Sequence, residues 1–220
     1  MARQRERGTR TSTGPVSADV IEQEAVRLFG ERSYPVVGMR DIGDAVGLLP
    51  GSLYVHISSK EDLLLRIVER GIRNYLERIE PIAKSADPPA ERLRAAIRAH
   101  LEVLAASQGQ TRVAFEQWTY LNAENREKVV ELRRRYEAAF TKIVRDGVKT
   151  GEFRTVRSQR IAVLATIGML NAAAQWYSPG GPMPAEEIGD ALADHVLLGL
   201  QVEVKAPVVK RGRTARGAAA

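Results

Sequence analysis

A short stretch between Met39 and Lys60 gathers residues suited to touching a polyanion. Pro50 favours the first turn of a helix, and Gly51 has no side chain, so the backbone there can approach another surface closely. Lys60 brings a positive charge to the expected start of the next helix, where free backbone N–H groups attract phosphate. The stretch therefore predicts a short helix whose first turn projects from the protein.

The residues around this turn predict how it is held. Gly43, Gly47 and Leu53 follow one another at intervals of four and six residues, which suits a helix, a glycine turn and a second helix over 39–57. The second helix, about two turns from Pro50, is too short to be stable alone because helix nucleation is costly. We expect it to pack on a shared apolar face made of Leu28, Phe29, Ile42, Val46, Leu48, Leu53 and Ile57. The positions left exposed are Leu49, Pro50, Gly51, Ser52, Tyr54 and His56.

Apolar residues recur at helical spacing along nearly the whole chain, and strand signals are nearly absent. We therefore expect an all-α fold of nine helices. A fourth helix of about 24 residues begins at a cap formed by Ser58 with Glu61 or by Ser59 with Asp62. The other predicted helices run from Ser17 to before Pro35, and over 39–46, 50–57, 87–107, 110–121, 123–150, 158–177 and 184–204. The small N-terminal helices and a larger C-terminal bundle are expected to share the long fourth helix.

The net charge of +6 is concentrated at the two ends of the chain. Residues 1–16 carry four arginines against one glutamate, and residues 205–220 carry five basic residues and no acid. The part between them is therefore slightly acidic. Basic arms suit binding to DNA, but a solubilising, disordered end is the interpretation we favour for the C-terminal tail.

Several classes of chemistry are disfavoured. The chain has no cysteine, and His56, His100 and His195 lie far apart in the sequence, so we expect no metal site. A Gly-rich phosphate loop and an evident pair of catalytic carboxylates are both missing, so we expect neither an enzyme nor a bound cofactor. The chain also lacks an apolar run of about 18 residues and a secretory signal, so we expect a cytoplasmic protein without a membrane partner.

The segment RDIGDAVGLLPGSLYVHISSKEDLL, Arg40 to Leu64, resembles the DNA-binding domain of the TetR/AcrR family of bacterial repressors. The segment GVKTGEFR, Gly147 to Arg154, is similar to the family's usual exit from its seventh helix. The resemblance implies a regulator that binds a palindromic operator in double-stranded DNA as a homodimer and is released by a small-molecule inducer. The expected domains are a basic flexible arm at 1–16, a helix-turn-helix DNA-binding domain at 17–62, a ligand-binding and dimerisation domain at 63–204, and a basic disordered tail at 205–220.

The resemblance also implies roles for single residues. Tyr54, His56 and Lys60 are expected to contact phosphates, and positions 49–52 are expected to face the bases. With Arg40, the first residue of the quoted motif, the expected DNA contacts are Arg40, Leu49, Pro50, Gly51, Ser52, Tyr54, His56 and Lys60.

This chain departs from the family pattern in ways that affect how it would read DNA. Gly38 stands where Thr is frequent, Leu49 where Ser is frequent, and Val55 and Ile57 where an aromatic residue is common. Polar groups for hydrogen bonds to base edges are therefore scarce. We expect Leu49 and Pro50 to contact thymine methyl groups while DNA shape supplies the remaining specificity.

The helices at 158–177 and 184–204 are expected to form the dimer seam, as the resemblance implies. Small residues along the first allow another helix to approach, and the second offers an apolar stripe. The expected interface residues are Ile167, Leu170, Ala174, Ile188, Leu192, Val196 and Gly199. An internal, alanine-rich core is the alternative explanation of this pattern.

Aromatic residues make up only 5% of the chain, yet several fall together in the predicted bundle. A pocket between bundle helices is a usual place for a small ligand, although aromatic residues at helical spacing are more often plain core. The residues expected to line a pocket are Arg112, Phe115, Glu116, Trp118, Phe140, Met169, Gln175 and Trp176.

The segment QWYSPGGPMPAEEIG, Gln175 to Gly189, is similar to the same junction in a subgroup that includes actinobacterial repressors of steroid and fatty-acid breakdown. This similarity implies a lipid-derived or acyl-CoA inducer, for whose phosphates Arg94, Arg98 and Arg112 are the nearest cations. Two other interpretations remain: a ligand-independent architectural DNA-binding or scaffold protein, and an all-helical enzyme with an incidental hairpin. The first would bind DNA without sequence preference, and the second would turn over a substrate.

Overall fold

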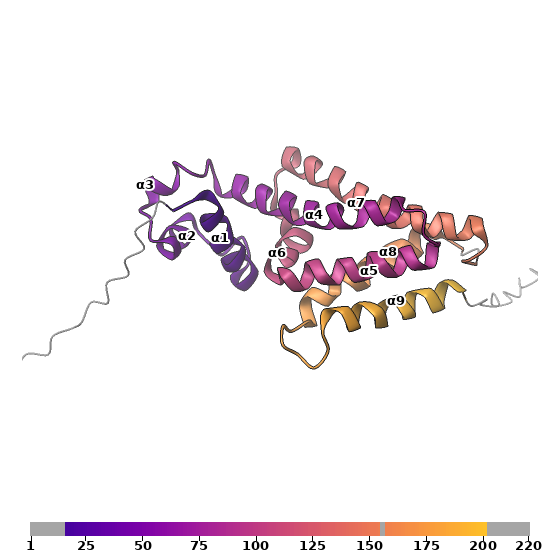
Figure 1. Ribbon diagram of the computed structural model, residues 1–220. Coiled ribbons are helices and arrows are strands. Elements are labelled where there is room, and N and C mark those ends of the chain that lie inside the picture. Colours follow the sequence, from indigo (N-terminus) through magenta and orange to yellow (C-terminus); the bar gives the residue numbers. More distant parts are fainter. Residues whose placement is uncertain (1–15, 155–156, 202–220) are drawn as a thin grey trace, which may run out of the picture.

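The three N-terminal helices form a small group at one end of the molecule (Figure 1). They are α1 (Ala18–Arg32), α2 (Met39–Val46) and α3 (Pro50–Leu53). The long helix α4 (Lys60–Lys84) leaves this group and runs into a larger bundle, so one continuous helix joins the two parts. The computed structural model describes residues 16–154 and 157–201, without the side chain of Pro50. The predicted arm before Val16 and the predicted tail at 205–220 lie outside these residues.

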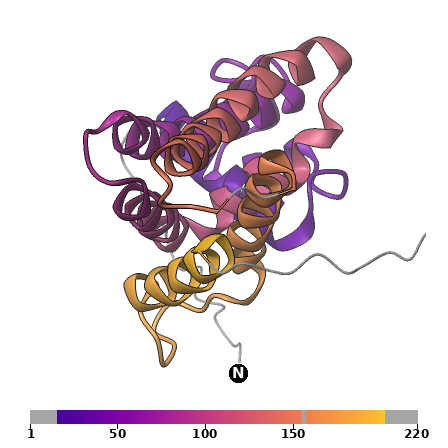
Figure 2. The same ribbon diagram turned by 90° about the vertical axis from the view of Figure 1, so that its right-hand side faces the viewer.

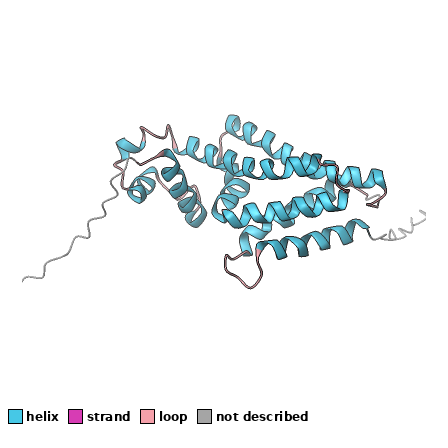
Figure 3. Ribbon diagram, in the orientation of Figure 1, coloured by secondary structure: helices cyan, strands magenta, loops and turns pink. Residues whose placement is uncertain are grey.

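The larger bundle is built from long helices that run roughly along α4. They are α5 (Pro89–Ala106), α7 (Ala123–Thr150), α8 (Gln159–Trp176) and α9 (Ala185–Gln201), with the short α6 (Gln108–Arg112) after α5. Figure 2 looks along the bundle and shows α9, in yellow, at its edge. α9 packs mainly on α5, and α4 packs on α5 and α7. Only helices and loops occur in the described residues, which confirms the predicted all-α fold of nine helices (Figure 3).

The helix predicted over 110–121 is not one regular helix, so that prediction was wrong. After α6 the chain forms a π-helix, η1 (Val113–Gln117), and then a 3-10 helix, η2 (Trp118–Tyr120). Both α1 and α4 pack against this region. The approach of α4 is very close, because a Cβ atom at Gly71 would lie only 2.7 Å from the Cβ of Ala114. Packing of α1 and α4 against residues 113–120 therefore decides their conformation, although the spacing of apolar residues there suits a regular α-helix.

The helix α3 is shorter than the two turns predicted from Pro50. Its α-helical residues end at Leu53, and the chain continues in turns where the N–H groups of Val55 and His56 donate to carbonyl groups three residues earlier. The chain must then become extended by Ser59, whose side chain caps α4 by accepting a 3.0 Å hydrogen bond from the Asp62 N–H. Little chain is left for a second helical turn.

The other helix ends follow their local signals. The Ser17 side chain accepts a hydrogen bond from the Val20 N–H at the start of α1, and Gly151 ends α7 with φ of 79°. α9 begins at Ala185, one residue after the predicted start, and its predicted end at 204 lies outside the described residues.

Candidate functional site

The α2–α3 hairpin, residues 39–57, is fixed from behind by apolar packing. Ile42, Leu53 and Ile57 are fully buried in the core that also contains Leu28 and Phe29. The predicted partners Val46 and Leu48 are partly buried against the same core. The prediction of a short element held by its neighbours is therefore confirmed.

Two glycines set the crossing of the hairpin helices. A Cβ atom at Gly43 would lie 3.0 Å from the Leu48 carbonyl oxygen, so a larger residue would force the helices apart. Gly47 takes φ of 72°, the left-handed conformation that glycine adopts without strain, and it ends α2. The hairpin angle follows from these two positions.

The edge of the hairpin that faces away from the core carries the predicted DNA contacts. Leu49 is 77% exposed and Tyr54 is 54% exposed. The other exposed predicted contacts are Arg40, Gly51, Ser52 and His56, while the side chain of Pro50 lies outside the described atoms. Val55 is 81% exposed beside them and was not among the predicted contacts. The side chains of this edge are therefore mostly apolar or small, and the positive charges lie at its borders.

Lys60 lies at the border of this edge and is half-buried rather than free. Its ammonium nitrogen sits 4.1 Å from the centre of the Tyr34 ring, in a cation–π contact. Burial lowers the pKa of Lys60 from its ordinary value, although the nearby Asp41 carboxylate favours the charged form. The sequence offered no sign of this contact, because Tyr34 belongs to the loop between α1 and α2.

Two side chains, Gln117 and Glu61, form hydrogen bonds that tie the hairpin end of the molecule to the bundle. The Gln117 side chain accepts a 2.7 Å hydrogen bond from the Tyr34 N–H and donates a 2.8 Å bond to the Phe29 carbonyl. The Glu61 carboxylate accepts hydrogen bonds of 2.9 Å from the Asn122 N–H and from the Asn125 side chain, which hold the pKa of Glu61 below its ordinary value.

Inside the bundle, an interior aromatic cluster joins α4, α5, η1 and α7. Its rings belong to Tyr75, His100, Phe115, Tyr136 and Phe140, with neighbouring ring centres 4.6–6.3 Å apart. The Tyr136 hydroxyl and His100 Nδ1 are 2.7 Å apart, and the Tyr75 hydroxyl lies 2.7 Å from the Thr111 hydroxyl. Burial lowers the pKa of His100 to about 3 and raises the pKa of both tyrosines. The histidine is therefore neutral at ordinary pH, as a structural core residue.

Arg133, on α7, is turned toward this cluster. Its guanidinium carbon lies 4.7 Å from the Trp118 ring centre and 5.5 Å from that of Phe115. Its buried Nη1, like the buried Oδ1 of Asn171 on α8, has no hydrogen-bond partner among the described residues. Burial lowers the pKa of Arg133 from its ordinary value. Unsatisfied buried donors and acceptors are costly, so these two atoms suit a ligand that supplies their partners.

Sequence reasoning missed Arg133 because it stands in a run of three arginines, which normally marks a solvated face. The predicted pocket residues themselves fall into separate places. Phe115, Trp118 and Phe140 belong to the cluster or to its Arg133 border. Met169 lines a hollow between α7, α8 and α9. The remaining predicted residues lie elsewhere: Arg112 is half-buried on α6, and Glu116, Gln175 and Trp176 are exposed.

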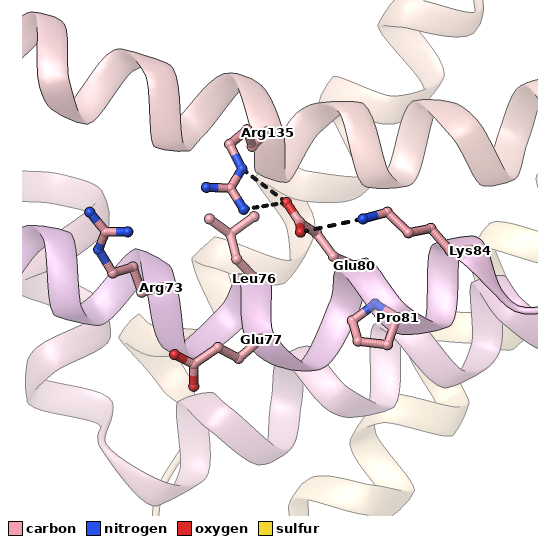
Figure 4. A pocket seen from close by; sticks show the side chains of 7 residues that line it. All are labelled: Arg73, Leu76, Glu77, Glu80, Pro81, Lys84 and Arg135. Carbon is pink, nitrogen blue, oxygen red and sulfur yellow. Dashed lines mark hydrogen bonds and ion pairs between the residues drawn. The ribbon is translucent and has the colours of Figure 1, made fainter.

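A separate groove lies between α4 and α7 (Figure 4). Glu80 stands in it and pairs with Arg135 at 2.8 Å and with Lys84 at 3.7 Å. The groove is open and is lined mainly by charged side chains, of which Glu80, Lys84 and Arg135 already pair with one another, so it is a poor enclosure for an apolar ligand. Arg94 and Arg98 are likewise engaged, because both pair with Asp190 and so tie α5 to α9. These two arginines are not free cations for a phosphate.

α8 carries an apolar stripe that nothing in the described chain covers. This α8 outer stripe consists of Ile161, Leu164, Ala165, Gly168, Ala172 and Trp176, all exposed. The predicted interface residues of α9 lie nearby in part, since Val196 and Gly199 line the same hollow as Ala165. Leu170 and Ala174, by contrast, are fully buried in their own chain, and Ile167 and Ile188 nearly so. These four side chains therefore leave almost no surface for a second copy to cover.

The described residues contain no group of three or more His, Cys, Asp or Glu side chains placed to hold a metal ion. None of their helices has the length and apolar character needed to cross a membrane.

Two family models match the chain. Residues 21–67 match the model described as bacterial regulatory proteins, tetR family, and residues 86–200 match the tetracyclin repressor-like C-terminal domain. The first match covers the α2–α3 hairpin and the start of α4, and the second covers most of the bundle.

Known proteins of similar sequence and structure agree with these matches. The HTH-type transcriptional repressor KstR2 of Mycolicibacterium smegmatis is 29% identical over 196 residues, which cover 86% of this chain and 94% of KstR2. The TetR family regulator PfmR of Thermus thermophilus has a TM-score of 0.76 and 35% identity, covering 83% of this chain and 99% of its own. The structure of AibR in complex with isovaleryl coenzyme A and operator DNA has a TM-score of 0.73 and 24% identity. The match covers 83% of this chain and 97% of AibR.

Proposed function

Because this chain belongs to the TetR family of bacterial regulatory proteins, we propose that it represses transcription by binding a near-palindromic operator as a homodimer in the cytoplasm. The observation that carries the proposal is the exposed edge of the α2–α3 hairpin, held rigid by the buried Leu53 and Ile57. A rigid, exposed, short helix is what a major groove accepts.

The residues of this edge divide into proposed base contacts and proposed phosphate contacts. Leu49, with the backbone at Gly51 and Ser52, faces the bases, and Leu49 contributes apolar contact with thymine methyl groups. Tyr54, His56, Lys60 and Arg40 contact phosphates and fix the register. Since hydrogen-bonding groups are few, sequence-dependent DNA shape carries much of the specificity.

The proposed dimer is formed by the α8 outer stripe together with the exposed part of α9. Its apolar side chains would be covered by the same stripe of a second copy, as a two-fold interface requires. In such a dimer, two hairpins about 34–36 Å apart can read half-sites one helical turn apart.

The proposed inducer is a lipid-derived molecule, with an acyl-CoA as the first class to test. The likeness to KstR2, described as a ketosteroid transcriptional regulator, and to AibR, solved with isovaleryl coenzyme A, supports this class. The buried Arg133 Nη1 supplies a hydrogen-bond donor beside the rings of Phe115 and Trp118, which suits an apolar group that carries a carbonyl or carboxylate. The buried Asn171 Oδ1 is an acceptor and suits an N–H or O–H group of the ligand.

The test is selection of binding sites from genomic fragments with the purified full chain, followed by release assays on the selected duplex. We expect one short near-palindrome, bound with steep salt dependence and released by isovaleryl-CoA or palmitoyl-CoA but not by free coenzyme A. Binding to all fragments alike would favour the architectural protein instead. A palindrome that none of these compounds releases would refute the acyl-CoA class while leaving the DNA-binding function in place.

A further inference from the structure

The side chain of Lys60 is held by the ring of Tyr34, and that ring is held in turn by the bundle. Tyr34 and Tyr120 lie with ring centres 5.8 Å apart and planes at 24°, which is a stacked pair. Phe29 meets Tyr34 edge-on at 5.2 Å. Tyr120 belongs to η2, beyond α4 and α5 in the sequence, so the lysine beside the hairpin depends on a residue of the C-terminal part.

The backbone of Tyr34 is fixed from the same side. Its N–H donates to the side chain of Gln117 in η1, and the residue after Lys60, Glu61, is bonded to Asn122 and Asn125. Residues 117–125 therefore hold both the Tyr34 ring and the first turn of α4. Lys60 lies between these two attachments.

We propose that Tyr34 and Tyr120 are positioning residues for DNA binding, which hold the Lys60 ammonium group ready for a backbone phosphate. The proposal rests on the proposed function, because it takes Lys60 as a phosphate contact. It adds that a residue of the bundle sets the strength of this contact.

The physical reason is the entropy of the lysine side chain. A free lysine must give up rotamer freedom when it meets a phosphate, and a cation–π contact removes part of that freedom in advance. The ring covers one side of the ammonium group and leaves other N–H donors available to the phosphate. With two protomers on one operator, loss of both stacks should weaken binding by about tenfold.

The experiment is a double-mutant cycle with Tyr120→Ala and Lys60→Ala. For each variant, the dissociation constant is measured over a range of salt concentrations. The DNAs are the selected palindrome and a random duplex of equal length. Lys60→Ala should lower the salt slope by about one unit per protomer on both duplexes. Tyr120→Ala should weaken binding about tenfold with the slope unchanged, because the charge remains. Tyr120→Phe, which keeps the ring, should bind like the unmodified chain, and so should Lys149→Ala at the far end of α7.

The cycle separates positioning from a general structural effect. In the Lys60→Ala background, Tyr120→Ala should weaken binding no further. Equal weakening with and without Lys60, or none in the unmodified background, would overturn the proposal. Thermal unfolding of each variant identifies loss of folding. Failure of the proposed function has a different signature, since no palindrome would be selected, whereas the cycle on the random duplex would still report on Lys60.

Discussion

Gln117 and Tyr34 lie 83 positions apart in the sequence, yet the Gln117 side-chain oxygen accepts a 2.7 Å hydrogen bond from the Tyr34 N–H. The same amide group donates to the Phe29 carbonyl at the end of α1. Close by, a Cβ atom at Gly30 would lie 3.6 Å from the Cα of Gly109 in α6, so the two backbones nearly touch. The hairpin end and the bundle are therefore joined by specific bonds as well as by α4.

The first prediction concerns the stability that this amide contributes. Gln117→Leu leaves the Tyr34 N–H without its partner and removes one of the two hydrogen bonds to the Phe29 carbonyl, which still accepts from the Ser33 N–H, so we expect the free energy of unfolding to fall by about 2 kcal/mol. Urea unfolding at fixed protein concentration measures it. Gln23→Leu, at an exposed position of α1, is the matched control and should change little. Equal stability of the two variants would contradict the role of Gln117.

The second prediction concerns sequence reading by Leu49. Replacing this exposed side chain by serine exchanges an apolar contact for a hydrogen-bonding group, so Leu49→Ser should change the preferred base at one position of each half-site by about 1–3 kcal/mol. The salt slope should stay the same because no charge is lost. Site selection with both proteins measures the change, and an unaltered site profile would show that Leu49 does not face a base.

The third prediction concerns the dimer. Ala172→Glu places a charge in the α8 outer stripe, and burying it against a second copy would be costly, so the variant should sediment as a monomer and bind the palindrome weakly. Ala95→Glu makes the same change at an exposed alanine of α5 and should remain dimeric. If Ala172→Glu stays dimeric in sedimentation equilibrium, another surface forms the dimer.

The fourth prediction is a pH dependence that arises from His100. Burial lowers the pKa of His100 from 6.5 to about 3, so between these values the unfolded chain binds a proton that the folded chain does not. Stability due to this group is present above pH 6.5 and falls with acidification, by about 2 kcal/mol between pH 7 and pH 5. His100→Gln should lose that much less stability than the unmodified chain over the same interval. The free energy of unfolding of both proteins is measured by urea unfolding at pH 7 and at pH 5. An equal loss of stability in the two proteins would contradict the prediction.

The fifth prediction concerns the end of α7. A Cβ atom at Gly147 would overlap the ring of Phe153, which is fully buried, so Gly147→Ala should destabilise the chain by about 1–3 kcal/mol. The cost should shrink in a Phe153→Leu background, because the smaller side chain can move aside. Urea unfolding of the four proteins measures the coupling, and an equal cost in both backgrounds would contradict the clash.

Much of the fold was predictable because its signals are local. Ser17 and Ser59 cap helices, and Gly47 and Gly151 end them, through contacts that span only a few residues. The aliphatic face behind the hairpin was predictable for a similar reason, since helical spacing places its members together. The α-to-π change at Val113 was not, because it depends on α1 and α4 packing against that segment.

The sequence by itself determined the helix order, the hairpin and its exposed residues, because caps, glycine turns and apolar spacing act within each segment. Only the tertiary structure decided which side of α8 faces outward, which of three neighbouring arginines turns inward, and that Tyr34 and Tyr120 meet beside Lys60. α8 is apolar on nearly every side, and a run of arginines has no preferred face. Such choices follow from contacts between residues far apart in the chain, which no local pattern records.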